Sequence, residues 1–296
     1  MVEKDRGFQI GINIVMILIT VMCLAPFVLL IMSSVTDEQA LIVNGYSFFP
    51  KKLSLEAYHY VLADSTSMLR AYGLSFLVTI IGTLCNLVIT TLFAYPLSRK
   101  ELFGRGFFAF FLYFTMLFSG GLVPTYIMWT RMFRIQNTFF ALIIPGLLMS
   151  AFNVIMMRTY FTTNIPEAVI EAVRIDGAHE FRILWSIVLP MAKPILATIL
   201  ILVGLGYWND WTNGLYYIND DRLYTVQVLL MNIQRSMEAI KQSMQQGGQA
   251  VTGAINMPST AVRMAVTVMC ILPVMIVYPF VQKQFVKGIA IGAVKG

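Results

Sequence analysis

Long apolar runs separated by short polar segments make up most of this chain. A membrane-spanning helix needs roughly 20 apolar residues, and six runs meet that length, although Asp210 interrupts the fifth. The pattern therefore predicts an all-α, polytopic membrane protein, with residues 1–8 as a cytoplasmic N-terminal segment and 9–296 as a single transmembrane domain. The six predicted transmembrane helices cover residues 9–33, 71–97, 107–130, 138–157, 195–218 and 262–282.

Residues 158–194, between the fourth and fifth predicted spans, mix polar and apolar positions throughout. The first part has helical periodicity, with Asn164 expected as its N-cap and Gly177 as a left-handed residue that ends it. Glu171 is expected to pair with Arg174 three residues later. An apolar face is predicted at Ile165, Ala168, Val169, Ala172 and Ile175, and a second apolar face at Phe181, Leu184, Trp185 and Val188.

This mixed segment has two interpretations. It is either an ordinary surface helix between two spans or a protruding helix that binds a soluble partner. The residue pattern favours the second interpretation, because Glu171-Ala172, then Gly177, then Ile187-Val188-Leu189-Pro190 follow a fixed spacing. That spacing resembles the EAA motif of permease subunits of ATP-binding-cassette (ABC) importers, with Val173 in place of the motif's second alanine.

The flanking residues resemble the carbohydrate-uptake, MalG-like branch of these binding-protein-dependent transport systems. The resemblance implies a cytoplasmic coupling helix between spans four and five. It also implies a second homologous permease, two ATP-binding subunits and an extracellular or periplasmic solute-binding protein as partners. The residues expected to couple to the ATPase are Glu171, Ala172, Arg174, Asp176, Gly177, Ile187, Leu189 and Pro190.

Composition and charge agree with a membrane protein. Hydrophobic residues make up 58% of the chain and charged residues 12%, about half the charged share of a soluble domain. The net charge of +6 comes from bases at the ends of the apolar runs, which indicates orientation in lipid rather than nucleic-acid binding. The bias favours both termini in the cytoplasm of a bacterial cell, with the chain in the cytoplasmic (inner) membrane.

The fifth predicted span contains Tyr207-Trp208-Asn209-Asp210-Trp211. A carboxylate inside a membrane segment is a candidate functional group, and aromatic rings beside amides and acids suit a sugar. The alternative is an aromatic belt at the outer membrane surface. Three further residues are assigned to the substrate path, each with packing as its alternative role: Asn153, Gly120 and Gly121. Glycines 120 and 121, followed by Pro124, are expected to break the third span.

The outer segment 219–259 holds a polar, glycine-containing stretch that predicts a flexible tip. By resemblance to maltose-type importers it is expected to contact the binding protein, although an ordinary loop is the alternative. The contact residues are Gln245, Gln246, Gly247 and Gly248.

No phosphate-binding loop, catalytic signature or zinc spacing occurs, so the chain is not expected to be an enzyme or to carry a cofactor or metal. ATP and magnesium are expected on the partner ATPase subunits. The sequence predicts a permease subunit for sugars, in particular oligosaccharides, some of them uronic-acid polymers. The alternatives are an amino-acid or peptide importer and an ion-gradient-driven transporter, for which Asp210 is the sole intramembrane carboxylate in the predicted spans.

Overall fold

The computed structural model describes residues 6–63, 65–245 and 260–276. Helices dominate this part of the chain, none of these residues lies in a β-strand, and an isolated bridge pairs Thr36 with Leu53. The helical, membrane-type class predicted from the sequence is therefore confirmed. The chain divides into two compact units: the residues up to Met68 with Leu230–Pro273, and Leu69–Leu229 with the residues from Val274 onward.

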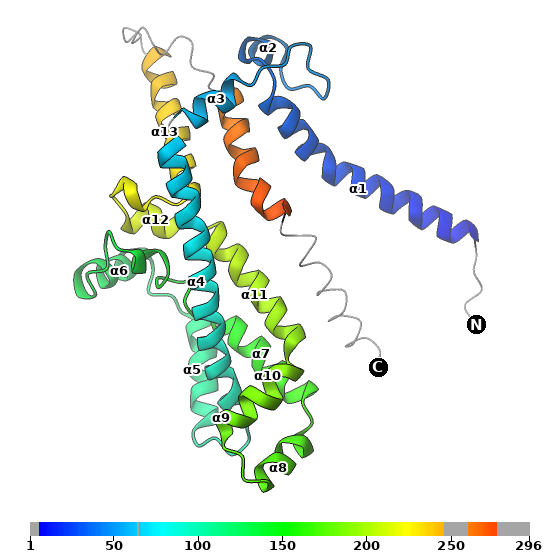
Figure 1. Ribbon diagram of the computed structural model, residues 1–296, viewed down its shortest axis with the longest axis vertical. Helices are drawn as coiled ribbons and strands as arrows, with labels where there is room; N and C mark the ends of the chain where they lie inside the picture. Colours follow the sequence, from blue (N-terminus) through cyan, green and yellow to red (C-terminus); the bar gives the residue numbers. More distant parts are fainter. Residues whose placement is uncertain (1–5, 64, 246–259, 277–296) are drawn as a thin grey trace. The chain divides into compact units, whose positions relative to one another are not determined.

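The first unit contains a long apolar helix and several short elements (Figure 1). Its helices are α1 (Arg6–Ser34), α2 (Glu38–Asn44), α3 (Glu56–Leu62) and an unlabelled apolar helix at Thr260–Ile276. The carboxylate of Glu38 accepts hydrogen bonds from the amides of Thr260 and Ala261, at 2.9 and 2.7 Å. A carboxylate in this position satisfies amides that have no partner within a helix's first turn.

The second unit is a bundle of broken helices. Its elements include α5 (Arg105–Leu117), α6 (Leu122–Ile127), η1 (Met128–Met132), η2 (Phe139–Leu142), α7 (Ala151–Asn164), α8 (Glu167–Ile175), α9 (Glu180–Ile183), η3 (Leu184–Val188), α10 (Leu189–Met191), α11 (Lys193–Trp208), α12 (Thr212–Tyr217) and η4 (Asp221–Leu223). Two helices begin in one unit and end in the other: α4 (Ser65–Ser98) and α13 (Val226–Gln245).

Fewer spans are evident in the structure than the six predicted. Within the described residues, α1 and α4 contain helices long and apolar enough to cross a membrane, at Gly7–Ser34 and Thr66–Ser98. Two further spans arise if each of two bent helix pairs counts as one crossing. The predicted spans 9–33 and 71–97 therefore correspond to single helices.

The third and fifth predicted spans are broken. Residues 107–130 form α5 and the α6–η1 pair, which meet at 112°. The break lies at Gly121, whose φ of +82° favours glycine, so the expected break is confirmed. In the fifth span, 195–218, α11 ends at Trp208 and α12 begins at Thr212.

The predicted fourth span, 138–157, is wrong as a single helix. Residues 143–150 are irregular, and α7 begins at Ala151 and continues to Asn164, into the predicted loop 158–194. Pro145 and Gly146, the latter with a φ of +71°, prevent a continuous helix here. Of the sixth predicted span, 262–282, residues up to 276 are helical and the rest lie outside the described residues.

Polar side chains from neighbouring helices hold the irregular segment 143–150. The Tyr207 hydroxyl donates to the carbonyl of Ile143 at 3.0 Å, Asn213 donates to that of Pro145 at 2.9 Å, and Asn86 donates to that of Leu147 at 2.6 Å. These bonds supply partners that an irregular backbone needs at membrane depth. The segment is therefore anchored to α4, α11 and α12.

Helices α4, α7 and α11 lie side by side and carry the core of the second unit (Figure 1). Close approach of α4 to α11 depends on Gly82, because a Cβ there would lie 2.5 Å from the ring of Tyr207. The largest fully buried side chains include Phe161 and Met157 of α7 and Ile199 of α11. Helix α8 packs against this core.

Candidate functional site

Helix α8 contains Glu171 and Ala172 of the EAA-like pattern and is a separate helix of nine residues. Its N-cap is Pro166; the prediction that Asn164 caps it is wrong, since Asn164 ends α7 and its amide donates to the Tyr160 carbonyl. At the other end, Gly177 has a φ of +80°. The amide of Gly177 bonds the Arg174 carbonyl and that of Ala178 bonds the Val173 carbonyl, which is a Schellman motif. The predicted left-handed end at Gly177 is confirmed.

The face of α8 that packs inward differs from the predicted apolar face. Ile170 is buried, as is Ile165 just before the helix, whereas Ala172 and Ile175 are exposed. Ile175 has 86% of its surface exposed. The motif residues Glu171, Ala172, Asp176 and Gly177 all lie at exposed positions. The structure therefore leaves a strip of small and apolar residues, next to a carboxylate, free for contact with another protein.

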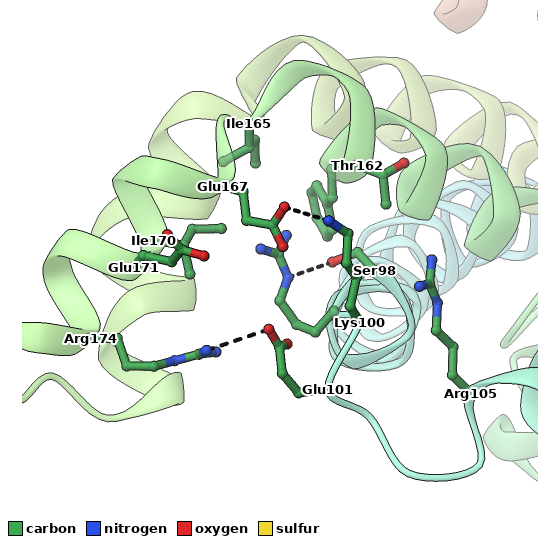
Figure 2. Close-up of a pocket in the computed structure, with 12 residues that line it drawn as sticks. Ser98, Lys100, Glu101, Arg105, Thr162, Ile165, Glu167, Ile170, Glu171 and Arg174 are labelled. Carbon is green, nitrogen blue, oxygen red and sulfur yellow. Dashed lines mark hydrogen bonds and ion pairs between the residues drawn. The ribbon is translucent and has the colours of Figure 1, made fainter.

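Ion pairs join α8 to the loop between α4 and α5 (Figure 2). Lys100 lies 2.6 Å from Glu167, at the start of α8. Arg174, near the end of α8, lies 2.7 Å from Glu180 and 3.7 Å from Glu101. The predicted Glu171–Arg174 pair is therefore replaced by longer-range partners, which sequence spacing alone does not show.

A cavity of about 170 Å³ lies between this loop, the end of α7 and α8 (Figure 2). Its walls carry charges of both signs, among them Arg99, Arg105 and Glu171. Arg105 and Arg158 each donate to the carbonyl of Leu97, both at 3.1 Å. These two bonds satisfy a carbonyl in the last turn of α4 and tie α4 to α5 and α7.

Two glutamates at this site have a lowered pKa. The hydrogen bond from Lys100 holds the pKa of Glu167 below its usual value, and the same bond raises the pKa of Lys100. For Glu180, burial acts to raise the pKa, but hydrogen bonds from Tyr95 and Arg174 outweigh it and the pKa is lowered. Both carboxylates are therefore ionised at neutral pH.

The second half of the mixed segment is a helix whose middle, η3, is a π-helix. Its buried residues are Ile183, Leu184 and Val188, whereas Phe181 and Trp185 are exposed, so the predicted second apolar face is wrong for the two aromatic residues. The three remaining motif residues lie where this helix approaches α11: Ile187 and Leu189 are half-buried and Pro190 is exposed. The Glu180–Met191 segment then meets α11 at 83°.

The predicted substrate-path residues fall on several elements. Tyr207 and Trp208 are buried, with the Trp208 ring 5.1 Å from that of Phe76, whereas Asn209 and Trp211 are exposed. The Asp210 carboxylate accepts hydrogen bonds from the amides of Thr212 and Asn213 and so caps α12.

The other substrate-path residues lie elsewhere. Asn153 is buried in α7, and Gly120 and Gly121 are exposed at the α5–α6 break. Tyr126 of α6 stacks on Tyr217 of α12 with ring centroids 5.9 Å apart. The helix that follows the α5–α6 break therefore contacts the helix that follows the α11–α12 break. A shared substrate path stays a prediction.

The predicted binding-protein contact lies mostly beyond the described residues. Gln245 is the last residue of α13, and Gln246, Gly247 and Gly248 lie outside the described residues. Residues 226–245, which precede the predicted flexible tip in the outer segment, form a 20-residue helix. Val226 and Val228 are buried, so the first turn of this helix packs against the rest of the protein.

Sequence reasoning missed Tyr95, Glu180 and Lys100 at this site. Tyr95 and Glu180 are 85 residues apart, yet the Tyr95 hydroxyl donates to the Glu180 carboxylate at 2.6 Å. A signal was present for Lys100, because a basic loop next to an acidic helix indicates pairing. Nothing in the spacing indicates the Tyr95–Glu180 bond.

Comparison with known proteins places the chain in a family. Residues 6–291 match the family described as "Binding-protein-dependent transport system inner membrane component". The chain is 35% identical over 294 residues to the polygalacturonan/rhamnogalacturonan transport system permease protein YtcP of Bacillus subtilis, covering 99% of this chain and 100% of that protein. It is 29% identical over 283 residues to the trehalose/maltose transport system permease protein MalG of Thermococcus litoralis, covering 95% and 94%.

A solved structure agrees with these relatives. It is a crystal structure of a bacterial ABC transporter involved in the import of the acidic polysaccharide alginate, with a TM-score of 0.79 and 30% identity. The match covers 96% of this chain and 99% of that chain. The resemblance to carbohydrate ABC importer permeases is confirmed, and the chain belongs to the family of binding-protein-dependent transport system inner membrane components.

Proposed function

We propose that the chain is one of two transmembrane subunits of an ATP-driven oligosaccharide importer. The observation that carries the proposal is α8, a short helix with an exposed strip at Ala172 and Ile175 and ion pairs at both ends. Such a helix suits the cleft of a soluble ATPase subunit, because it exposes an apolar strip beside the Glu171 carboxylate and ends in a defined left-handed conformation at Gly177. ATP and magnesium bind the two ATPase subunits, and a second permease completes the path.

The proposed topology has six spans with both termini in the cytoplasm. In this arrangement the α4–α5 loop and α8 face the cytoplasm, whereas α2, α3 and the end of α13 face the binding protein. The exposed Asn209 and Trp211 lie next to the break between α11 and α12. Helix breaks at membrane depth are typical of substrate sites in transporters, which supports this end of α11 as a part of the sugar path.

The proposed substrates are oligosaccharides that contain uronic acids. This rests on relatives: one is named for polygalacturonan and rhamnogalacturonan, and the similar solved structure for the acidic polysaccharide alginate. The two alternatives have less support. An ion-gradient transporter needs intramembrane charges as relays, and Asp210 is the sole carboxylate in the predicted spans. An amino-acid or peptide importer has no counterpart among the relatives described above.

Copurification of the ATPase tests the proposal. Glu171→Lys reverses an exposed charge on α8, and Gly177→Glu adds a charged side chain to the exposed end of α8 as well as straining its left-handed backbone. Each variant, once inserted normally, is expected to lose the ATPase and the uptake of oligogalacturonides. Glu56→Lys, an equal charge reversal on α3, is expected to keep the ATPase.

Three results would contradict parts of the proposal. If the wild-type chain copurifies no ATPase and uptake follows an ion gradient, the importer assignment is wrong. If α8 variants retain the ATPase, α8 is not the coupling element. If neutral maltodextrins compete for uptake and oligogalacturonides do not, the acidic substrate class is wrong.

A further inference from the structure

A side-chain network connects α8 and α9 to the cytoplasmic end of α4. The Tyr95 hydroxyl, from the last turns of α4, donates to one oxygen of Glu180 at 2.6 Å, and Arg174 donates to the other at 2.7 Å. Arg99 stacks over the Tyr95 ring, with its guanidinium carbon 5.2 Å from the ring centroid. Glu180 thus receives one donor from α4 and one from α8, so it fixes the position of one helix relative to the other.

The position of these residues along the chain gives the network a particular role. Helix α8 is connected through the backbone to α7 at residues 165–166 and to α9 at residues 176–179. Its links to α4 and the following loop run through side chains: apolar contacts beneath Ile170, the Lys100–Glu167 and Arg174–Glu101 pairs, and the Arg174–Glu180–Tyr95 chain. Apolar contacts permit sliding, whereas charged hydrogen bonds specify one arrangement.

The network contributes little to folding stability. The side chains of Arg174 and Glu180 have 39% and 53% of their surface exposed, and ion pairs this exposed are weak. A network that adds little stability but links two helices is suited to holding one helix in a fixed position relative to the other. Tyr95 takes part in this network through its hydroxyl, which is the donor from α4. Its ring is buried in the core of the second unit, so removal of the hydroxyl leaves the ring's packing in place.

We infer that Tyr95, Glu180 and Arg174 form a positioning joint that makes α4 follow the movement of α8. The inference rests on the proposed function of α8 as the ATPase-coupling helix. It assigns Arg174 to α4 of its own subunit rather than to the ATPase, which differs from the docking role predicted for it. When the joint is broken, the ATPase still docks on α8 and hydrolyses ATP, but α4 no longer moves with it, and hydrolysis is uncoupled from import.

The test uses the complete transporter in proteoliposomes and measures ATP hydrolysed per oligosaccharide imported. Tyr95→Phe removes one hydroxyl, and Glu180→Gln and Arg174→Gln remove charges from exposed side chains. Each is expected to raise the ratio about threefold, which corresponds to about 0.65 kcal/mol, in the range for exposed ion pairs. The amount of copurified ATPase is expected to stay unchanged. Tyr113→Phe, at an exposed tyrosine of α5, is the matched control and is expected to keep the wild-type ratio.

A double-mutant cycle makes the test specific. If Arg174 and Glu180 act through one joint, the double variant raises the ratio no further than either single variant. An unchanged ratio in Tyr95→Phe and Glu180→Gln, with normal ATPase content, would overturn the joint and leave the coupling role of α8 intact. Loss of the ATPase from Arg174→Gln alone would return Arg174 to the docking surface and also overturn it. A wild-type complex without ATPase would overturn the joint and the proposed function together.

Discussion

At the scale of single residues, Gly177 shows how one conformation shapes a partner surface. A Cβ at this position meets nothing within 4 Å, so a substitution there acts through the backbone and not through a steric clash. With a φ of +80°, alanine costs about 1 kcal/mol, whereas asparagine tolerates the left-handed region better.

Gly177→Ala is therefore expected to weaken the affinity of the permease for its ATPase about fivefold. Gly177→Asn is expected to weaken it less, because asparagine keeps the end of α8 in place. Titration of the detergent-solubilised permease with ATPase measures both. Equal affinities for the alanine and asparagine variants would show that the conformation at this position is unimportant for docking.

The Lys100–Glu167 pair makes a prediction about pH. The pKa of Glu167 is lowered by Lys100, so its stabilising contribution is fully present above the usual glutamate pKa and is lost as the pH falls through the lowered value. The pKa of Lys100 is raised by Glu167, so that contribution is present below the usual lysine pKa and is lost as the pH rises through the raised value.

The melting temperatures of wild type and Glu167→Gln are therefore expected to differ by a small, constant amount between about pH 6 and 9, because a pair this exposed stabilises a protein only weakly. The difference is expected to shrink as the pH falls below roughly 4. Lys100→Gln is expected to give the same profile, and the double variant no larger difference. A gap between wild type and Glu167→Gln that persists undiminished in acid would contradict the pairing.

At the scale of helices, Gly82 and Gly73 provide a matched comparison on α4. A Cβ at Gly82 would lie 2.5 Å from the Tyr207 ring, whereas one at Gly73 meets nothing within 4 Å. Alanine improves helix propensity at both sites, but at Gly82 it pushes α11 away or displaces the Tyr207 hydroxyl from the Ile143 carbonyl.

Gly82→Ala is therefore expected to destabilise the protein by about 1–3 kcal/mol, as for overpacking of a core. Gly73→Ala is expected to leave stability unchanged or raise it slightly. Thermal unfolding in detergent measures both. Adding Tyr207→Leu to Gly82→Ala is expected to recover part of the loss, because the smaller side chain makes room; no recovery would mean that the contact with Tyr207 is not the cause.

The elements also show what the sequence could predict. Single long helices at α1 and α4 follow from apolar length alone, and the breaks near Gly121 and after Trp208 follow from glycine and from the polar residues around Asp210. The irregular segment 143–150 was missed because its neighbours satisfy its carbonyls. Asn86 and Asn213, which donate to these carbonyls, are 61 and 68 residues away from their partners. A hydropathy profile contains no information on pairs so far apart in the sequence.

The candidate site likewise has features that the sequence predicts and features that it does not. The left-handed end of α8 was predictable, because Gly177 is a local requirement of the backbone. The inward face of α8 and the partners of Arg174 were not, because both depend on how α4 and α7 pack beneath it. Local rules predict where a helix ends, whereas tertiary contacts decide which side of it is buried.

At the scale of the whole molecule, the break between α5 and α6 determines how often the chain crosses the membrane. The 112° angle between α5 and the α6–η1 pair fits either a broken span or a re-entrant loop. The two differ in where Phe133, just after η1, lies. A broken span places Phe133 on the side opposite the α4–α5 loop, and a re-entrant loop returns it to the same side.

Cysteine labelling with a membrane-impermeant maleimide separates the two arrangements. The native Cys23, Cys85 and Cys270 are first replaced by alanine, and single cysteines are then placed at two exposed sites, Phe103 and Phe133, which have 97% and 57% of their surface exposed. With six spans, Phe133→Cys is labelled in intact cells and Phe103→Cys only after permeabilisation. Labelling of both only after permeabilisation would make the bent pair a re-entrant loop. It would also reverse the side assigned to α7 and α8 and remove the cytoplasmic position on which ATPase docking depends.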